Sequence, residues 1–185
     1  MLELPADSQL MERVKTGDTR AFRQLVEQHL PKAHAIARRM LSSQADAEEA
    51  AQDAFSKLWV NAQKFDAAQA RFSTWFYRIL SNTCLDMLRK RPSPMLDISE
   101  MEHTLPDPRA RHDQHYEARM ESERICRAVQ SLPERQRLAV VLCYFEEMTN
   151  PEAAAVMDMH VKALEGLLVR ARKTLRELLD ERHAA

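Results

Sequence analysis

Apolar residues recur along most of the chain at intervals of three and four residues, which is the period of an amphipathic α-helix. Only two glycines interrupt this pattern, while alanine, leucine, glutamate, arginine and methionine, all good helix formers, are abundant. The sequence therefore predicts an all-α fold. The expected helices cover about residues 7–16, 19–30, 31–41, 46–60, 73–91, 134–145, 150–157 and 161–178.

Polar residues and helix breakers predict where the first helices begin and end. Asp7 and Ser8 can cap the first helix, and Gly17 can end it, because glycine adopts the left-handed conformation of a C-cap at little cost. Asp18 precedes the second helix. Pro31 then opens a further helical turn, since proline suits the first position of a helix.

Capping signals also mark the later helices. Asp46–Glu49 and Thr149–Glu152 have the form of capping boxes, in which the first side chain accepts from free backbone amides and the last reaches back. Ser131–Glu134 has the same form and carries proline in the first turn, and Ser73 can cap the aromatic-rich segment that follows it. These signals divide the chain into short helices joined by tight turns.

A proline-rich segment divides the chain in two. Residues 92–116 contain four of the eight prolines, no sustained helical period and more acidic than basic residues, which predicts an extended, flexible linker. We therefore expect two small helical domains, over residues 1–91 and 117–185. In the second, a turn at residues 158–160 predicts a helix-turn-helix, and Asp158 tolerates the left-handed conformation of such a turn.

Charge is distributed unevenly along a chain whose formal net charge is only -1. The segment Arg71–Arg91 has a local charge of +4, from five Lys and Arg residues against Asp86. His160–Arg176 also reaches +4, from five Lys and Arg residues against Glu165. The predicted helix over residues 46–60 is largely acidic on its polar side. A nearly neutral chain is poorly suited to bind bulk DNA alone, because non-specific affinity comes mainly from neutralising phosphates.

Aromatic rings and guanidinium groups occur together in the segment Arg71–Arg91, and two interpretations of it are open. Unstacked bases of single-stranded nucleic acid can lie on aromatic rings while Arg and Lys follow the phosphates. Alternatively, the rings are core residues of an amphipathic helix whose charges are solvated. Trp75, Tyr77, Arg78 and Asn82 fall between the predicted core and the surface.

The second helix of the predicted helix-turn-helix has two different faces. Its inward positions are apolar, and its outward positions carry Lys162, Arg170, Lys173 and Arg176, as a helix placed in a DNA major groove requires. A bundle helix with a solvated basic side has the same pattern. The pattern alone leaves both interpretations open.

Several classes of function lack support in the sequence. No apolar segment approaches the roughly 20 residues that span a bilayer, and the N-terminus lacks the order of a secretion signal, so we expect a cytoplasmic protein without membrane insertion. Acidic as well as basic polar faces disfavour a membrane-surface helix. There is no phosphate-binding glycine loop, no HExxH motif and no nucleophile with a neighbouring base, so we expect no catalytic residues and no enzyme activity.

No metal site and no cofactor are predicted. His29 and His34 have no carboxylate or cysteine at ligand spacing, and His112 and His115 lie in a polar stretch without further ligands. The three cysteines are far apart and outside CxxC pairs, which argues against a disulfide framework or a zinc site. We interpret them as small buried hydrophobic residues, with a redox role as the alternative.

Four segments together resemble one protein family in their order and spacing. They are DAEEAAQDAFSKLW (46–59), FSTWFYRILSNTCLDMLRKR (72–91), SLPERQRLAVVLCYFEEMT (131–149) and EAAAVMDMHVKALEGLLVRARKTLREL (152–178). The chain resembles a bacterial RNA polymerase sigma factor of the extracytoplasmic-function (ECF) type. The resemblance implies a transcription initiation factor that binds core RNA polymerase, reads and melts promoters, and is controlled by an anti-sigma factor.

The resemblance also implies a polymerase-binding surface. The helix over residues 46–59 is similar to the surface that binds the clamp helices of the largest polymerase subunit. The contacts expected there are Asp46, Glu49, Gln52, Asp53 and Lys57.

The segment 72–91 resembles the part of the family that melts the downstream, minus-ten promoter element and reads its non-template strand. Asn82 matches the position that lines a pocket for a flipped base, beside Tyr77 and Arg78. Extruding a base costs a few kcal/mol of stacking, which contacts in the pocket must offset. The contacts expected with this element are Phe65, Arg71, Trp75, Tyr77, Arg78, Asn82, Arg89, Lys90 and Arg91.

The predicted helix-turn-helix resembles the family's reader of the upstream, minus-thirty-five element. The chain departs from the family at Glu165 and Gly166, where relatives often carry Arg and Ser. A carboxylate cannot make the bidentate contact to guanine that Arg makes, but it can accept from cytosine N4, which predicts an unusual upstream sequence. The contacts expected with this element are Asn150, Lys162, Glu165, Gly166, Arg170 and Lys173.

These inferences favour a sigma factor over two rivals. A stand-alone repressor that uses only the helix-turn-helix leaves the acidic helix and the aromatic segment unexplained, and an enzyme lacks a catalytic constellation. Two modest DNA-reading domains on a flexible linker gain from effective concentration once both sit on polymerase. We expect the segment Arg71–Arg91 to act only after the acidic helix has docked on polymerase, and to be covered in the free protein.

Overall fold

The computed structural model describes residues 6–90 and 124–180, and every regular element within these ranges is helical. The first group of helices comprises α1 (Ala6–Lys15), α2 (Thr19–Met40), α3 (Gln44–Val60), the short η1 (Ala62–Lys64) and α4 (Phe72–Lys90). The second comprises a helical segment at 124–130, α6 (Glu134–Val140), the π-helical turn η3 (Val141–Phe145), α7 (Asn150–Val156) and α8 (Val161–Asp180). The predicted all-α fold is confirmed, and the expected linker, with His112 and His115, lies outside the described residues.

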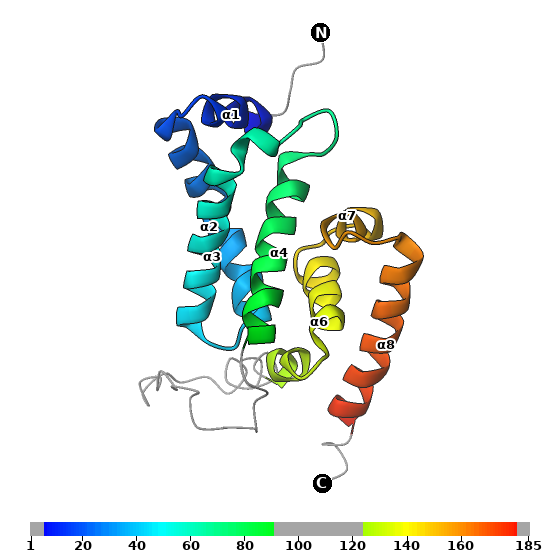
Figure 1. Ribbon diagram of the computed structural model, residues 1–185. Coiled ribbons are helices and arrows are strands. Elements are labelled where there is room, and N and C mark those ends of the chain that lie inside the picture. Colours follow the sequence, from blue (N-terminus) through cyan, green and yellow to red (C-terminus); the bar gives the residue numbers. More distant parts are fainter. Residues whose placement is uncertain (1–5, 91–123, 181–185) are drawn as a thin grey trace, which may run out of the picture.

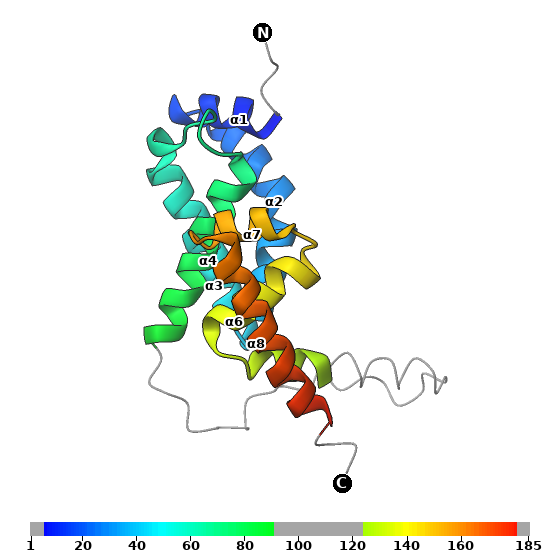
Figure 2. The ribbon, with the colours of Figure 1, turned by 90° about the vertical axis from the view of Figure 1, so that its right-hand side faces the viewer.

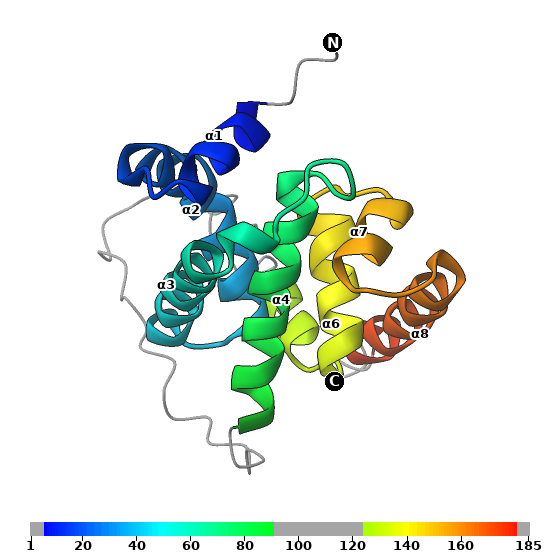
Figure 3. The same ribbon diagram turned by 45° about the horizontal axis from the view of Figure 1, so that its top comes forward.

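Helix α4, the last of the first group, lies where this group meets the second (Figure 1). Helices α2 and α3 pack on one side of it and α6 and α7 on the other, with α8 beyond them (Figure 3). The buried apolar side chains form one continuous cluster that includes residues of both groups. Because α4 is covered from two directions, side chains on several of its faces are buried, from Phe72 and Phe76 to Cys84 and Leu85.

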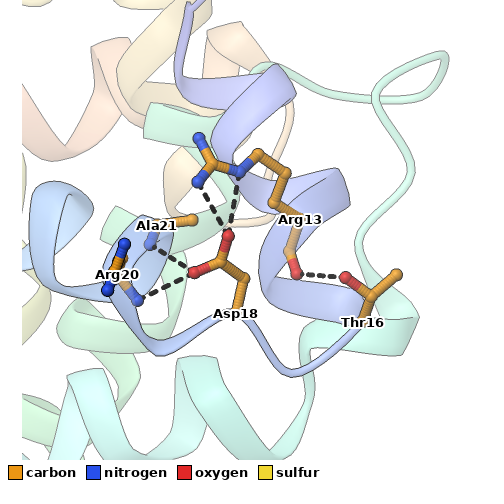
Figure 4. A network of polar contacts seen from close by, with 5 residues as sticks. All are labelled: Arg13, Thr16, Asp18, Arg20 and Ala21. Carbon is orange, nitrogen blue, oxygen red and sulfur yellow. Dashed lines mark hydrogen bonds and ion pairs between the residues drawn. The ribbon is translucent and has the colours of Figure 1, made fainter.

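Asp18 joins α1 to α2 and caps the second helix (Figure 4). Its Oδ1 accepts hydrogen bonds from the backbone amides of Arg20 at 2.9 Å and Ala21 at 3.1 Å, and its Oδ2 accepts from the Arg13 guanidinium at 2.7 Å. The amide of Ala21 and the guanidinium of Arg13 hold the pKa of Asp18 below its ordinary value, so the cap is charged at neutral pH. Gly17 makes the preceding turn at a φ of 86°, as predicted.

Pro31 lies inside α2, and the expected start of a new helix there is wrong. Proline removes one backbone hydrogen bond from a helix interior and usually kinks or ends the helix. Here α2 has fully buried residues on both sides of the proline, including Leu25 and Ile36. Burial of these residues against neighbouring helices holds the two halves of α2 in one element.

The start of α3 differs from the prediction by about one turn. Ser43 is the N-cap, and its Oγ accepts from the backbone amide of Asp46 at 3.3 Å. Asp46 therefore lies in the first turn and does not cap the helix. Ser43 and Asp46 also match the capping pattern, in which a hydroxyl stands three residues before an acidic residue. The Asp46 carboxylate, in the first turn, interacts favourably with the positive end of the helix dipole.

Two other predicted caps are also wrong. α4 begins at Phe72, so Ser73 lies within its first turn. α6 begins after Pro133, and the Ser131 hydroxyl donates to the carbonyl of Arg127 in the preceding helical segment. The Ser131 hydroxyl thus has a local backbone partner that competes with the cap.

Candidate nucleic-acid interface

Helix α3 presents its polar side to solvent. Glu49, Gln52 and Asp53 are exposed, and Asp46 is half-buried at the start of the helix. Lys57 is 2.8 Å from the Asp53 carboxylate and also donates to the Thr83 hydroxyl of α4 at 2.9 Å. The opposite side is the predicted packing stripe, and all its members are buried: Ala47, Ala50, Ala51, Ala54, Phe55 and Leu58.

An apolar groove of about 400 Å³ continues the exposed side of α3. Positions 49, 53, 56 and 60 follow one side of the helix, and Val60 at its end is 78% exposed. The rings of Phe22 and Trp59 beside it meet edge to face, with centroids 5.0 Å apart. The groove is lined by Thr19, Phe22, Ser56, Trp59 and Val60. This groove was not predicted from the sequence, although Val60, an apolar residue on the same side of the helix as Glu49 and Asp53, is a signal of it.

Phe65 and Trp75 form a ring cluster near the start of α4. Phe65 is 2% exposed, and its ring centroid lies 5.4 Å from that of Trp75 and 6.2 Å from that of Phe72. The Lys15 ammonium lies 5.6 Å from the Phe65 centroid. Both residues were expected to contact DNA, but only Trp75, which is half-buried, has part of its ring at the surface.

Tyr77 is a core residue in this arrangement. Its side chain is 3% exposed, and its hydroxyl lies 3.3 Å from Nδ1 of His29 on α2. Burial, with smaller effects of the Glu146 and Asp7 carboxylates, raises the pKa of Tyr77 well above its ordinary value. The Tyr77 ring therefore links α4 to α2 and does not face solvent.

Arg71 and Arg78 face the helix-turn-helix. Arg78 donates to the carbonyl of Ala155 in α7 at 2.7 Å and lies 3.3 Å from the Asp158 carboxylate in the turn that follows. Arg71 lies 3.6 Å from the Glu152 carboxylate at the start of α7. Two charges expected to contact DNA are thus paired with the second group of helices.

Asn82 is exposed and lines a small pocket of about 90 Å³ between the two groups of helices. Arg89 is exposed and lies 3.6 Å from the Asp86 carboxylate, and Lys90 is exposed at the end of α4. Arg91 lies outside the described residues. The pocket has one wall from α4 and another from the second group, and its lining is Ser81, Asn82, Leu85, Asp86, Arg89, Arg135, Leu138 and Met157.

Glu146 is the centre of another contact between the two groups. Its side chain is only 8% exposed, and its carboxylate oxygens lie 3.1 Å from the Arg39 guanidinium and 3.5 Å from the Lys32 ammonium, both on α2. Arg137 of α6 donates to the carbonyl of Met40 at the end of α2 at 2.7 Å. None of these contacts was predicted from the sequence. Together with the contacts of Arg71 and Arg78, they are called the interdomain contacts below.

Helices α7 and α8 form the predicted helix-turn-helix. The Thr149 amide and hydroxyl donate to the Glu152 carboxylate at 3.0 Å and 2.8 Å, and the Thr149 hydroxyl accepts from the Glu152 amide at 3.4 Å, which confirms the predicted capping box. The Thr149 hydroxyl, followed by its amide, lowers the pKa of Glu152. Asp158 has a φ of 51°, the left-handed turn that was predicted.

The predicted upstream-element residues lie mostly on the free side of α8. Figure 2 shows this helix at the front of the molecule, facing away from the first group. Its inner side is buried through Leu164, Leu167, Leu168 and Ala171. Lys162, Glu165, Arg170 and Lys173 are exposed, while Gly166 and Asn150 are half-buried, and Asn150 Oδ1 lies 3.9 Å from the Cys143 thiol.

The expected burial of the cysteines is only partly correct. Cys84 is buried, and burial raises its pKa to about 12, as suits a small hydrophobic residue, but Cys126 is exposed and its expected burial is wrong. The helical segment that carries Cys126 buries Ala128 and Val129, which lie on another side of it.

Within residues 6–90 and 124–180, no three potential metal ligands lie together, and none of the helices there is long and apolar enough to cross a membrane.

Comparison with known proteins matches both groups of helices to one family. The model of Sigma-70 region 2 matches residues 25–92, and that of Sigma-70, region 4 matches residues 122–175. The ECF RNA polymerase sigma factor SigW of Bacillus subtilis is 30% identical over 180 residues, which cover 92% of this chain and 95% of SigW. The chain belongs to the ECF sigma factors.

Further similarities agree with this membership. The ECF RNA polymerase sigma-E factor of Escherichia coli K12 is 32% identical over 183 residues, which cover 95% of each chain. Among solved structures, CnrH in complex with the cytosolic domain of CnrY has a TM-score of 0.72 and 31% identity, and the match covers 96% of this chain and 99% of CnrH. As a sigma factor, the protein binds core RNA polymerase and promoter DNA to direct transcription initiation.

Proposed function

We propose that this ECF sigma factor binds core polymerase through the exposed side of α3, reads the melted downstream element with α4 and reads the upstream element with α8. It acts in the cytoplasm, without enzyme activity of its own. The observation that carries the proposal is that these three surfaces are chemically distinct: α3 is acidic, while α4 and α8 carry the clustered positive charge. An acidic side repels DNA phosphates and suits a protein partner, and the basic sides suit nucleic acid.

The polymerase-binding surface consists of Asp46, Glu49, Gln52, Asp53 and Lys57 together with the apolar groove that ends at Val60. Stable interfaces combine a desolvated apolar centre with a charged rim. The groove supplies the apolar contact, and the acidic positions one to three turns away supply charge complementarity. We assign both to one partner because they follow the same side of α3.

The downstream-element surface consists of Asn82, Trp75, the basic residues Arg71, Arg78, Arg89 and Lys90, and Arg91 outside the described residues. Asn82 offers a hydrogen-bonding amide at the mouth of a pocket, beside two arginines that attract phosphate. The buried rings of Phe65 and Tyr77 support this surface from within, because they pack against other residues of the first group.

The packed arrangement is the free form of the protein in this proposal. The two promoter elements are about 25 base pairs apart, which is roughly 85 Å of B-DNA at 3.4 Å per base pair. A packed chain of this length has a radius of gyration of about 16 Å. Since α4 contacts α7 directly, the two reading surfaces cannot reach both elements until the interdomain contacts break.

Control by an anti-sigma factor fits this free form. The structural relative CnrH was solved in complex with the cytosolic domain of CnrY. A partner that binds the packed arrangement more tightly than the separated one stabilises the packed arrangement. The stabilisation equals the difference between the partner's binding free energies for the two arrangements. We therefore propose an anti-sigma factor that holds the two domains together and so keeps α4 covered.

Asn82→Ala is expected to slow promoter opening by about 10- to 100-fold, because it removes the amide that hydrogen-bonds a flipped base, at about 1.5–3 kcal/mol. Polymerase binding should be unchanged, since Asn82 is on a different helix from the acidic side of α3. Permanganate reactivity of unpaired thymines in the downstream element measures opening.

Gln28→Ala is the matched control for this substitution, because it removes an exposed amide from α2. It should open promoters at the wild-type rate. Normal permanganate reactivity with Asn82→Ala would remove Asn82 from the flipped-base pocket.

A further inference from the structure

An isolated apolar side chain lies on the basic side of α8. Of the residues that the structure describes, few large apolar ones are exposed, and Val169, at 61%, is the one on this helix. Valine lowers helix propensity relative to alanine, and here it gains no burial in return. Folding therefore gives no reason for valine at this position.

The surroundings of Val169 place it on the proposed DNA-reading stripe. Glu165 is four residues before it and Lys173 four residues after, and both are exposed. At 1.5 Å per residue, the distance along the axis from Lys162 to Val169 is about 10 Å, which corresponds to roughly three base pairs. Residues in the first turns of a recognition helix are the ones that contact base edges.

Gly166 adds to this arrangement by its lack of a side chain. A Cβ at this position would meet only the Arg170 guanidinium, at 3.6 Å. The Arg170 guanidinium therefore lies back over Gly166, one turn toward the start of α8, instead of extending away along the helix. Cations on this side of α8 attract the backbone phosphates and bring the valine methyl groups into the groove.

We propose that Val169 contacts the 5-methyl group of a thymine in the upstream element and so helps to determine promoter specificity. This inference rests on the proposed reading of that element by α8. The thymine methyl is the one apolar group that a base pair presents in the major groove, and an aliphatic side chain is its natural partner. Glu165, one turn earlier, can accept from cytosine N4, and a cytosine read in this way would lie within about two base pairs of the thymine.

Substitution of single thymines by deoxyuridine tests the contact, because deoxyuridine lacks only the methyl group. The template is a promoter recovered from a randomised selection with the wild-type holoenzyme. We expect one upstream thymine at which deoxyuridine weakens wild-type holoenzyme binding about fourfold, the effect of one buried methyl group. With Val169→Ala, binding to the thymine template is weakened by a similar factor, and deoxyuridine at that position has no further effect.

Lys173→Ala is the matched control on the same helix, and it should weaken binding to thymine and deoxyuridine templates alike. Circular dichroism verifies that each variant keeps its helices. Promoter-specific binding in which Val169→Ala has the wild-type response to deoxyuridine at every position would overturn this inference and leave the proposed function standing. Absence of promoter-specific binding by the wild-type holoenzyme would overturn both.

Discussion

Reversing the charges of Glu49 and Asp53 to Arg is expected to weaken binding to core RNA polymerase by at least about 100-fold. Both side chains are exposed on one side of α3, four residues apart. If that side faces a complementary basic surface, two reversed charges replace attraction with like-charge repulsion, which costs several kcal/mol. Co-elution with core polymerase on a sizing column, followed by titration, measures the loss.

The fold should survive this double substitution. Asp53 pairs with Lys57 at the surface of α3, with both side chains about half exposed, and such pairs contribute about 1 kcal/mol or less. Glu12→Arg with Glu27→Arg is the matched control, because it reverses two exposed acidic residues on α1 and α2. Equal polymerase binding by the α3 variant and this control would show that the interface lies elsewhere.

Glu146→Gln is expected to separate the two domains of the free protein. The Glu146 carboxylate is almost fully covered and joins two cations of α2 to the C-terminal group of helices. Loss of charge-assisted contacts at a covered site costs about 1.5–3 kcal/mol, which shifts the equilibrium toward the separated form by roughly 10- to 150-fold. Small-angle X-ray scattering should show a larger radius of gyration for the variant.

Glu147→Gln is the control for this experiment, because it removes the same charge from an exposed neighbour. It should scatter as the wild type does. High salt should also enlarge the wild type, since Lys32 and Arg39 are partly exposed and their attraction to Glu146 is screened. If Glu146→Gln keeps the wild-type dimensions at all salt concentrations, the interdomain contacts do not hold the domains together.

The helices with strong local signals were the ones that the sequence predicted well. The alanine-rich stripe of α3 is buried as its spacing indicated, and the Thr149 capping box starts α7 at the expected residue. Both signals depend on residues within a turn or two of each other. Where two local signals competed, as at Ser43 and Asp46, the choice between them was not determined by the pattern.

Features that depend on distant residues were not predicted. Pro31 continues a helix because neighbouring helices bury the residues on both sides of it. Tyr77 is a core residue because His29, from a helix 48 residues earlier, lies beside its hydroxyl. Glu146 has the appearance of an ordinary acidic surface residue in the sequence, and only the packing of η3 on α2 covers it.

Promoter-directed initiation is tested most directly by in vitro transcription of a genomic promoter library with core polymerase, with and without this protein. The expected result is a new, restricted set of start sites that share an upstream and a downstream element, produced only when both proteins are present. Start sites that do not change when the protein is added, together with tight and specific duplex binding by the isolated chain, would contradict the sigma-factor mechanism and favour a repressor.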